Sequence, residues 1–133
     1  MADFIIPKGR EFIFTVTVME KDTLLTQDVE NFDASNSSVQ FRELATMTCV
    51  PGNCILQKIP DDATASPLTY KGGKIKVIVP NTLTTLMNTE RGEKVDGYYL
   101  KPTYEGIITI AFTDDTPTRT VMLENIYIIP ATC

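Results

Sequence analysis

Apolar residues recur at every second position in several separate segments of this chain, which is the period of β-strands that bury one face. The clearest segment has one face made of Phe12, Phe14, Val16 and Val18, and the other of Ile13, Thr15 and Thr17. A second segment alternates Ile75, Val77 and Val79 against Lys74, Lys76 and Ile78. Only Thr82–Asn88, with leucines three apart, favours a helix, and there a single capped turn. The pattern predicts an all-β chain.

Both ends of the chain also predict strands. Near the C-terminus an alternating run from Ile108 to Phe112 meets the polar turn 113–117, and a second β-rich run follows to Ile129, as in a closing hairpin. At the N-terminus Phe4–Ile6 is followed by Pro7. Because proline cannot donate to a central ladder, we expect a short edge strand there.

The middle of the chain is less regular. Polar residues dominate from Lys21 to Ser38, and we expect a long connection between two sheets, anchored by Leu24, Leu25, Val29 and Phe32. Alternation resumes at Val39 and continues to Val50, with a bulge near Glu43–Ala45. The segment Ile55–Ile59 predicts the next strand.

Strand-like runs separated by turns, in a chain of 133 residues, predict one domain, 1–133, with a two-layer antiparallel β-sandwich fold. A closed β-barrel is the alternative, because both architectures bury alternate residues.

Composition and charge narrow the function classes. The chain has no histidine, which is the commonest general base and metal ligand, so we expect no catalytic residue, metal or cofactor. Its formal charge of −5 disfavours nucleic acid as a partner. No signal peptide and no run of about 18 apolar residues is present, so we expect no membrane contact and synthesis in a cytosol.

Three cysteines occur, at positions 49, 54 and 133. Cys49 and Cys54 flank Pro51-Gly52, and a hairpin there would bring them within disulfide range. The alternative is that both are reduced, as is usual for proteins made in the cytosol.

Acidic pairs occur at Asp61-Asp62 and Asp114-Asp115. We interpret both pairs as turns, where Asp is favoured by hydrogen bonds to its own backbone. Weak Ca²⁺ binding at these loops is the alternative, although the loop pattern of an EF-hand is absent.

Three of the five tyrosines, Tyr98, Tyr99 and Tyr104, lie close together in the sequence. If they share a face they form an aromatic platform for a sugar or a protein partner. The simpler interpretation is that Tyr98 and Tyr99 point to opposite faces of one strand.

Four segments in this order resemble a known family. They are Ile6–Val18, with Lys8-Gly9 before the alternating strand; Gly73–Leu86, a strand followed by a Thr-rich turn; Gly97-Tyr98-Tyr99; and the hairpin that ends Ile126–Ile129. Together they resemble the Ig-like β-sandwich domains of tailed-bacteriophage virion proteins, such as those that open baseplate and fibre-anchoring proteins. The resemblance implies an Ig-like sandwich without catalytic residues, located in the virion after synthesis in the host cytoplasm.

The role that the resemblance implies is that of an adaptor, docking or decoration subunit that contacts other virion proteins and copies of itself. The apolar terminal segments invite such contacts if they are left unpaired at sheet edges. Their candidate contact residues are Phe4, Ile5, Ile6, Tyr127 and Ile128. Loops 22–38 and 88–96 are the alternative contact surface.

A small carbohydrate-binding or adhesion module is the competing function, with weak sugar contact at the tyrosine platform. The absence of tryptophan weighs against it.

Overall fold

Short strands joined by polar loops make up most of the part of the chain that this computed structural model describes, residues 4–20, 23–87, 93–95, 98–100 and 103–129. The elements are β1 (Phe4–Pro7), β2 (Phe12–Thr17), β3 (Phe32–Glu43), β4 (Ile55–Lys58), β5 (Lys74–Val79), α1 (Asn81–Thr84), β6 (Glu93–Val95), β7 (Tyr98–Leu100), β8 (Tyr104–Phe112) and β9 (Arg119–Ile129). The all-β prediction is confirmed.

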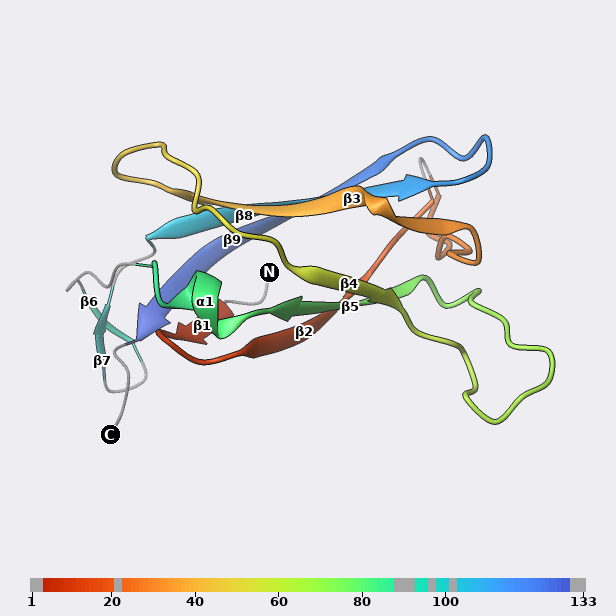
Figure 1. The fold of residues 1–133 in the computed structure, drawn as a ribbon, viewed down its shortest axis with the longest axis horizontal. Helices are drawn as coiled ribbons and strands as arrows, with labels where there is room; N and C mark the ends of the chain where they lie inside the picture. Colours follow the sequence, from red (N-terminus) through yellow and green to blue (C-terminus); the bar gives the residue numbers. More distant parts are fainter. Residues whose placement is uncertain (1–3, 21–22, 88–92, 96–97, 101–102, 130–133) are drawn as a thin grey trace.

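The strands form two main sheets that lie one above the other (Figure 1). The four-stranded sheet has the order β1-β9-β8-β3 and the three-stranded sheet the order β2-β5-β4, while β6 and β7 form a separate ribbon at one end. The expected two-layer, sandwich-like arrangement is therefore present, and the described strands do not close into a barrel.

One strand pair departs from the predicted antiparallel order. Hydrogen-bonded neighbours run antiparallel except β1 and β9, which are parallel. A hairpin forces its two strands to be antiparallel, but β1 and β9 come from opposite ends of the sequence and no hairpin joins them. Turn signals in the sequence therefore do not determine their relative direction.

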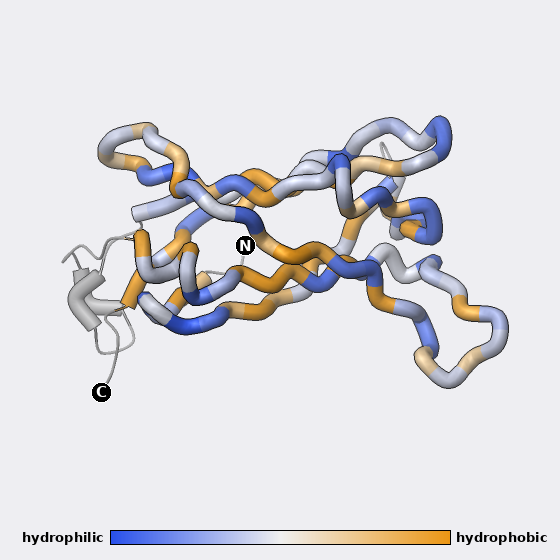
Figure 2. The backbone as a smooth tube through the Cα atoms, viewed as in Figure 1, coloured by the Kyte–Doolittle hydropathy of each residue, from blue (hydrophilic) through white to orange (hydrophobic). Residues whose placement is uncertain are grey.

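The hydrophobic core lies between the facing sides of the two sheets. The three-stranded sheet contributes Ile75, Val77 and Val79, each 0% exposed, as the alternation predicts. The four-stranded sheet contributes Phe41 and Ile108, among others. Figure 2 shows the hydrophobic residues concentrated along the strands. Each fully buried side chain of this size stabilises the fold by about 1.5–3 kcal/mol.

The predicted faces of β2 are confirmed, with the difference that β2 is the edge strand of its sheet. Val16 is buried, whereas Phe12 and Phe14 are half-buried. The Phe14 ring centre lies 5.2 Å from that of Phe4, edge to face, and 5.6 Å from that of Phe12. Because β1 and β2 are edge strands of different sheets, these three rings fill the gap between the layers on that side.

The closing hairpin is confirmed. β8 and β9 pair antiparallel, with Ile108 opposite Val121, and a register shift separates the Tyr104–Ile126 pair from the Gly106–Leu123 pair. Without this bulge, residues three apart on β9 would point to opposite faces. With it, Leu123 and Ile126 both face the core, at 3% and 0% exposure.

β3 begins earlier than predicted, at Phe32, so the connection from the three-stranded sheet ends at residue 31. The polar stretch belongs to the strand but shifts register between Asp33 and Ser38. The Asp33 carboxylate accepts hydrogen bonds from the Ser35 backbone N–H (3.1 Å) and from Asn36 Nδ2 (2.6 Å). These local hydrogen bonds form an irregularity that hides the strand alternation.

β3 also ends earlier than predicted, at Glu43. The chain then turns back, with Met47 at φ 57°, and the Val50 N–H donates to the Phe41 carbonyl oxygen at 2.8 Å. The predicted continuation of the strand to Val50 is wrong, because residues 48–50 lie beside β3 and do not extend it.

A single helical turn is present, but it begins one residue before the predicted Thr82 and ends earlier, and the predicted cap is wrong. α1 spans Asn81–Thr84, no side chain caps its N-terminus, and Asn88 lies outside the described residues. After α1, the Lys8 ammonium donates to the carbonyl oxygens of Thr85 (2.9 Å) and Met87 (2.5 Å). A cation there complements carbonyl groups that have no helical partner.

Candidate interaction surfaces

The two terminal segments predicted to be free edges pair with each other. In the β1–β9 pair, Phe4 lies opposite Ile126 and Ile6 opposite Ile128. Ile6 and Ile128 are each 1% exposed and belong to the core. The expectation that both segments are left unpaired is wrong, because each end of the chain supplies the other's hydrogen-bonding partner.

The opposite face of this strand pair is more accessible. Ile5 lies opposite Tyr127, and both side chains are half-buried. Since β1 ends the strand order of its sheet, its outer side is still a sheet edge.

Tyr104 does not join a surface platform. It is 1% exposed, and its hydroxyl donates to Glu43 Oε2 at 3.1 Å. In β7 the backbone sets Tyr98 opposite Val95 of β6, while the side chains of Tyr98 and Tyr99 lie outside the described residues. The prediction of a platform of three tyrosines is therefore wrong for Tyr104.

A band of three isoleucines crosses the outer face of the three-stranded sheet. The register sets Ile13 of β2 and Ile55 of β4 on the two sides of Ile78 of β5. Ile13 is 49% exposed, Ile55 is 51% exposed, and Ile78 between them is half-buried. We call Ile13, Ile78 and Ile55 the isoleucine row.

The sequence contained part of the signal for the isoleucine row. Ile13 and Ile78 lie at positions of their strands where alternation predicts a solvent-exposed face. What alternation cannot supply is the register between strands, which depends on how all three strands pair. Sequence reasoning therefore missed the row.

The same outer face is cationic. β2, β4 and β5 contain no Asp or Glu, although the chain has 17 of them. Next to the isoleucine row, Thr15 and Gln57 lie on the two sides of Lys76, and beyond them Thr17 lies opposite Lys74. The apolar band is thus bordered on one side by two lysines.

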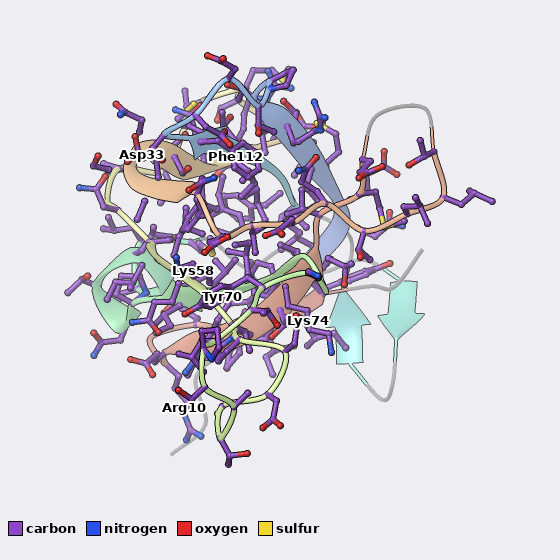
Figure 3. The ribbon with its side chains drawn as sticks, turned by 90° about the vertical axis from the view of Figure 1, so that its right-hand side faces the viewer. Arg10, Asp33, Lys58, Tyr70, Lys74 and Phe112 are labelled. Carbon is purple, nitrogen blue, oxygen red and sulfur yellow. The ribbon has the colours of Figure 1, made fainter. Side chains whose placement is uncertain are left out.

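A third lysine of this sheet points elsewhere. Lys58 donates to the Glu30 carbonyl oxygen at 2.6 Å, and its Nζ lies 4.3 Å from the centre of the Tyr70 ring (Figure 3). Such a cation–π contact is worth about 0.5–1 kcal/mol at an exposed site. Lys58 therefore secures a loop and does not add charge to the outer face.

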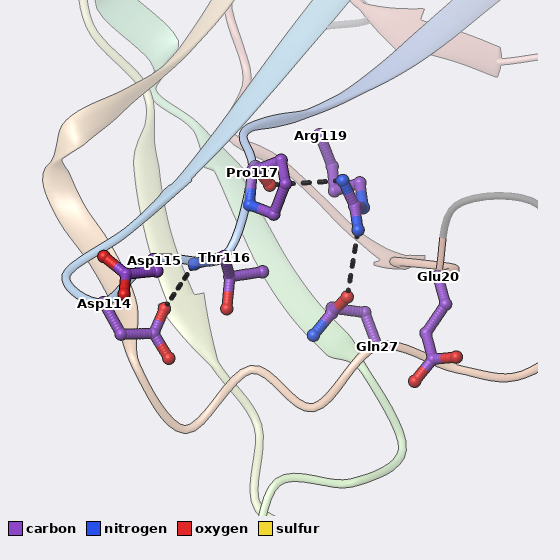
Figure 4. Close-up of a pocket in the computed structure, with 7 residues that line it drawn as sticks. All are labelled: Glu20, Gln27, Asp114, Asp115, Thr116, Pro117 and Arg119. Atoms are coloured by element: carbon purple, nitrogen blue, oxygen red, sulfur yellow. Dashed lines mark hydrogen bonds between the residues drawn. The ribbon is translucent and has the colours of Figure 1, made fainter.

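A polar cleft of about 550 Å³ lies between the β8–β9 loop and the chain after β2 (Figure 4). Its lining consists of Glu20, Gln27, Asp114, Asp115, Thr116, Pro117 and Arg119. Arg119 donates to the Pro117 carbonyl oxygen (3.3 Å) and to Gln27 Oε1 (3.4 Å). Asp114 accepts from the Thr116 backbone N–H (3.0 Å), and hydrogen bonds from Thr116 lower the pKa of its carboxyl group. The Arg119–Gln27 hydrogen bond joins the two loops, whereas the other two contacts hold the β8–β9 loop in shape.

An apolar tip projects from the connection after β2. Leu24 is 95% exposed and Leu25 64% exposed. The prediction that both leucines anchor this loop in the protein is wrong, whereas Val29 does anchor it, at 0% exposure.

The acidic pair Asp61-Asp62 lies in a turn, as predicted. The Asp61 carboxylate accepts from the backbone N–H groups of Gly72 (2.7 Å) and Lys71 (2.8 Å), and these bonds lower its pKa. Asp62 accepts from the Thr64 N–H at 2.9 Å. Among the described residues, no three Cys, Asp or Glu side chains gather in a way that could hold a metal ion.

Cys49 and Cys54 are both free thiols. They do not face each other across a hairpin, because Cys49 pairs with Arg42 and the following residues cross to β4 in the other sheet. Burial raises the pKa of Cys54 to about 11. The reduced alternative is the one seen, and Cys133 lies outside the described residues.

Comparison with known proteins gave no match among protein-family models, curated proteins or solved structures. In the described part of the chain, no helix has the length and apolar character needed to span a membrane.

Proposed function

We propose that the chain is a non-enzymatic structural subunit that works through protein–protein contacts, as an adaptor, docking or decoration subunit of a bacteriophage virion. The virion setting and the Ig-like type of sandwich rest on the resemblance of the four sequence segments. The contact role rests on the isoleucine row.

The isoleucine row supports a contact role because its outer two side chains keep about half of their surface exposed in the free chain. Its side chains face away from the core, and burying the exposed half of Ile13 or Ile55 would stabilise a complex by about 1 kcal/mol each. Isolated exposed apolar residues are ordinary on proteins, whereas these three isoleucines lie side by side on neighbouring strands, and this contiguity supports the proposal.

The polar cleft favours the alternative function, a small carbohydrate-binding or adhesion module. Carboxylate, amide and guanidinium groups line it, and such groups can hydrogen-bond sugar hydroxyls. A glycan array probed with the wild type and with Asp115→Ala tests this alternative. Binding that is lost in the variant would favour the carbohydrate function.

The experiment that tests the structural function is fractionation of particles from cells that produce the protein in its native genetic context. We expect the chain to sediment with the particles in a fixed ratio to the other particle proteins. Ile13→Lys should reduce this incorporation. The matched control is Met122→Lys, which changes a side chain of similar exposure, 46%, on the four-stranded sheet. A wild-type chain found only in the unsedimented fraction would refute the proposal.

A further inference from the structure

We infer that the outer face of the three-stranded sheet pairs with the same face of a second copy of this chain, in an antiparallel, two-fold symmetric contact. The inference rests on the proposed function and names the partner of its contact surface. It is drawn from the cross-strand rows of residues that follow one another along this face, and from the charges that these rows carry.

The rows on this face have opposite charges on the two sides of the isoleucine row. On one side lies Lys76, two residues along β5 from Ile78. On the other side lies Glu11, which directly precedes β2, is exposed and continues the alternation of Ile13 and Thr15. Both are two residues, about 6.7 Å, from the isoleucine row along their strands.

A two-fold contact requires a face that is complementary to itself. If the axis runs along the isoleucine row, the row of one copy meets the row of the other, and the strands of the two copies are antiparallel. Glu11 of each copy then faces the Thr15–Lys76 row of its neighbour, which brings opposite charges together twice. If the axis runs along the strands, Lys76 faces Lys76. The charges therefore favour the axis along the row.

The size of the face sets the strength of this contact. Strands of six, four and six residues, about 4.8 Å apart, span roughly 250 Å² per copy. Two such faces bury roughly half of the 1,200 Å² or so that stable complexes bury at least. A free pair of copies is therefore weak, and the contact becomes strong only where several copies are held together, as on a larger particle.

The chain's net charge of −5 opposes association at long range. This repulsion is screened beyond about 8 Å at physiological ionic strength. At contact distance β2, β4 and β5 contribute no acidic side chain, and the Glu11 carboxylate that lies beside β2 faces the Thr15–Lys76 row of the other copy, so it meets a cation there.

The inference is tested by measuring the average mass of the purified full chain by sedimentation equilibrium over an about hundredfold range of concentration. We expect the average mass to rise from that of one copy toward that of two. Glu11→Lys and Lys76→Glu should each weaken association about tenfold, because two attractive pairs become repulsive. The double variant Glu11→Lys/Lys76→Glu should restore association to about the wild-type level.

The rescue by the double variant separates a lost contact from a lost fold, and Met122→Lys should leave association unchanged. A wild type that is monomeric at every concentration would overturn the inference, as would a double variant as weak as the single ones. If either result were found and the chain still sedimented with the particles, the proposed function would stand. The partner on this face would then be a different protein.

Discussion

On the outer face of the four-stranded sheet, Arg42 lies directly opposite Glu105 and forms an ion pair with it, whereas on the three-stranded sheet Lys76 lies between Thr15 and Gln57. The two faces thus differ in how they place charge. One balances its charges across neighbouring strands, and the other has cations without an acidic residue in the same sheet.

The apolar residues of the two outer faces differ in the same way. The four-stranded sheet sets Ile107 between Gln40 and Met122, so that a polar and a flexible side chain flank this isoleucine. The three-stranded sheet sets three isoleucines side by side. The comparison teaches that two sheets sharing one core can have different outer faces, one with paired charges and a separated isoleucine, and the other with a contiguous isoleucine row beside lysines.

The largest expected loss of stability comes from the core between the two sheets. Phe41→Ala should lower the free energy of unfolding by about 3–5 kcal/mol, since Phe41 is 1% exposed. Phe14→Ala should cost less, about 1–3 kcal/mol, because the ring is half-buried at the sheet edge. Urea denaturation measures both values. Equal losses would contradict this difference, because they would show that Phe14 at the sheet edge is as deeply buried as Phe41.

A smaller loss of stability is expected for substitutions in β1, the edge strand of the four-stranded sheet. Ile6→Ala should cost about 2–4 kcal/mol, because Ile6 is 1% exposed between β9 and the core. Ile5→Ala, on the outer side of the same strand, is the control and should cost under about 1 kcal/mol. Thermal unfolding followed by circular dichroism gives both. A negligible effect of Ile6→Ala would mean that β1 is not part of the folded sheet.

The different placement of charges on the two sheets predicts a still smaller effect on the free energy of unfolding. Glu105→Gln should destabilise the protein by about 0.5–1 kcal/mol, because it removes one partner of a cross-strand ion pair. Lys76→Gln should change the stability by less than about 0.3 kcal/mol. Chemical denaturation at low and high salt measures the two effects. A larger loss for Lys76→Gln would contradict the contrast.

The smallest effect concerns pH and the loop before β5. The pKa of Asp61 is lowered in the folded state, chiefly by the hydrogen bond from the Gly72 N–H and next by that from the Lys71 N–H. Its stabilisation is therefore present above the unfolded-state pKa, about 3.9, and is lost as the pH falls through the lower folded-state pKa. Asp61→Asn should melt below the wild type at pH 7, and the gap should close below about pH 4. A gap that stays constant with pH would exclude this role.

Local pattern was enough to predict the inward faces of the strands. Val77 and Ile108 are buried as alternation requires, because one period of two residues decides both strand type and face. Alternation failed where side chains made their own hydrogen bonds, as at Asp33, and where a residue with positive φ turned the chain, as at Met47.

The candidate contact surface depended on information that the sequence pattern does not hold. Phe4 and Ile128 are as apolar and β-prone as free edges would be, but whether they pair with each other is decided by the whole sheet. Likewise Ile13, Ile55 and Ile78 are far apart in the chain, and only the register of three strands brings them together. Tyr104 was misassigned because its strand was expected to begin only at Ile108. β8 begins at Tyr104, and the same alternation places Tyr104 on the inward face with Ile108.

Lysine acetylation of the free chain and of the chain in the proposed particle, read by mass spectrometry, tests most directly whether the outer face of the three-stranded sheet is the contact surface. Lys74 and Lys76 should be labelled in the free chain and protected in the particle. Lys71, which is exposed in the loop before β5, should be labelled equally in both states. Equal labelling of Lys74 and Lys76 in the two states would contradict the assignment of this face.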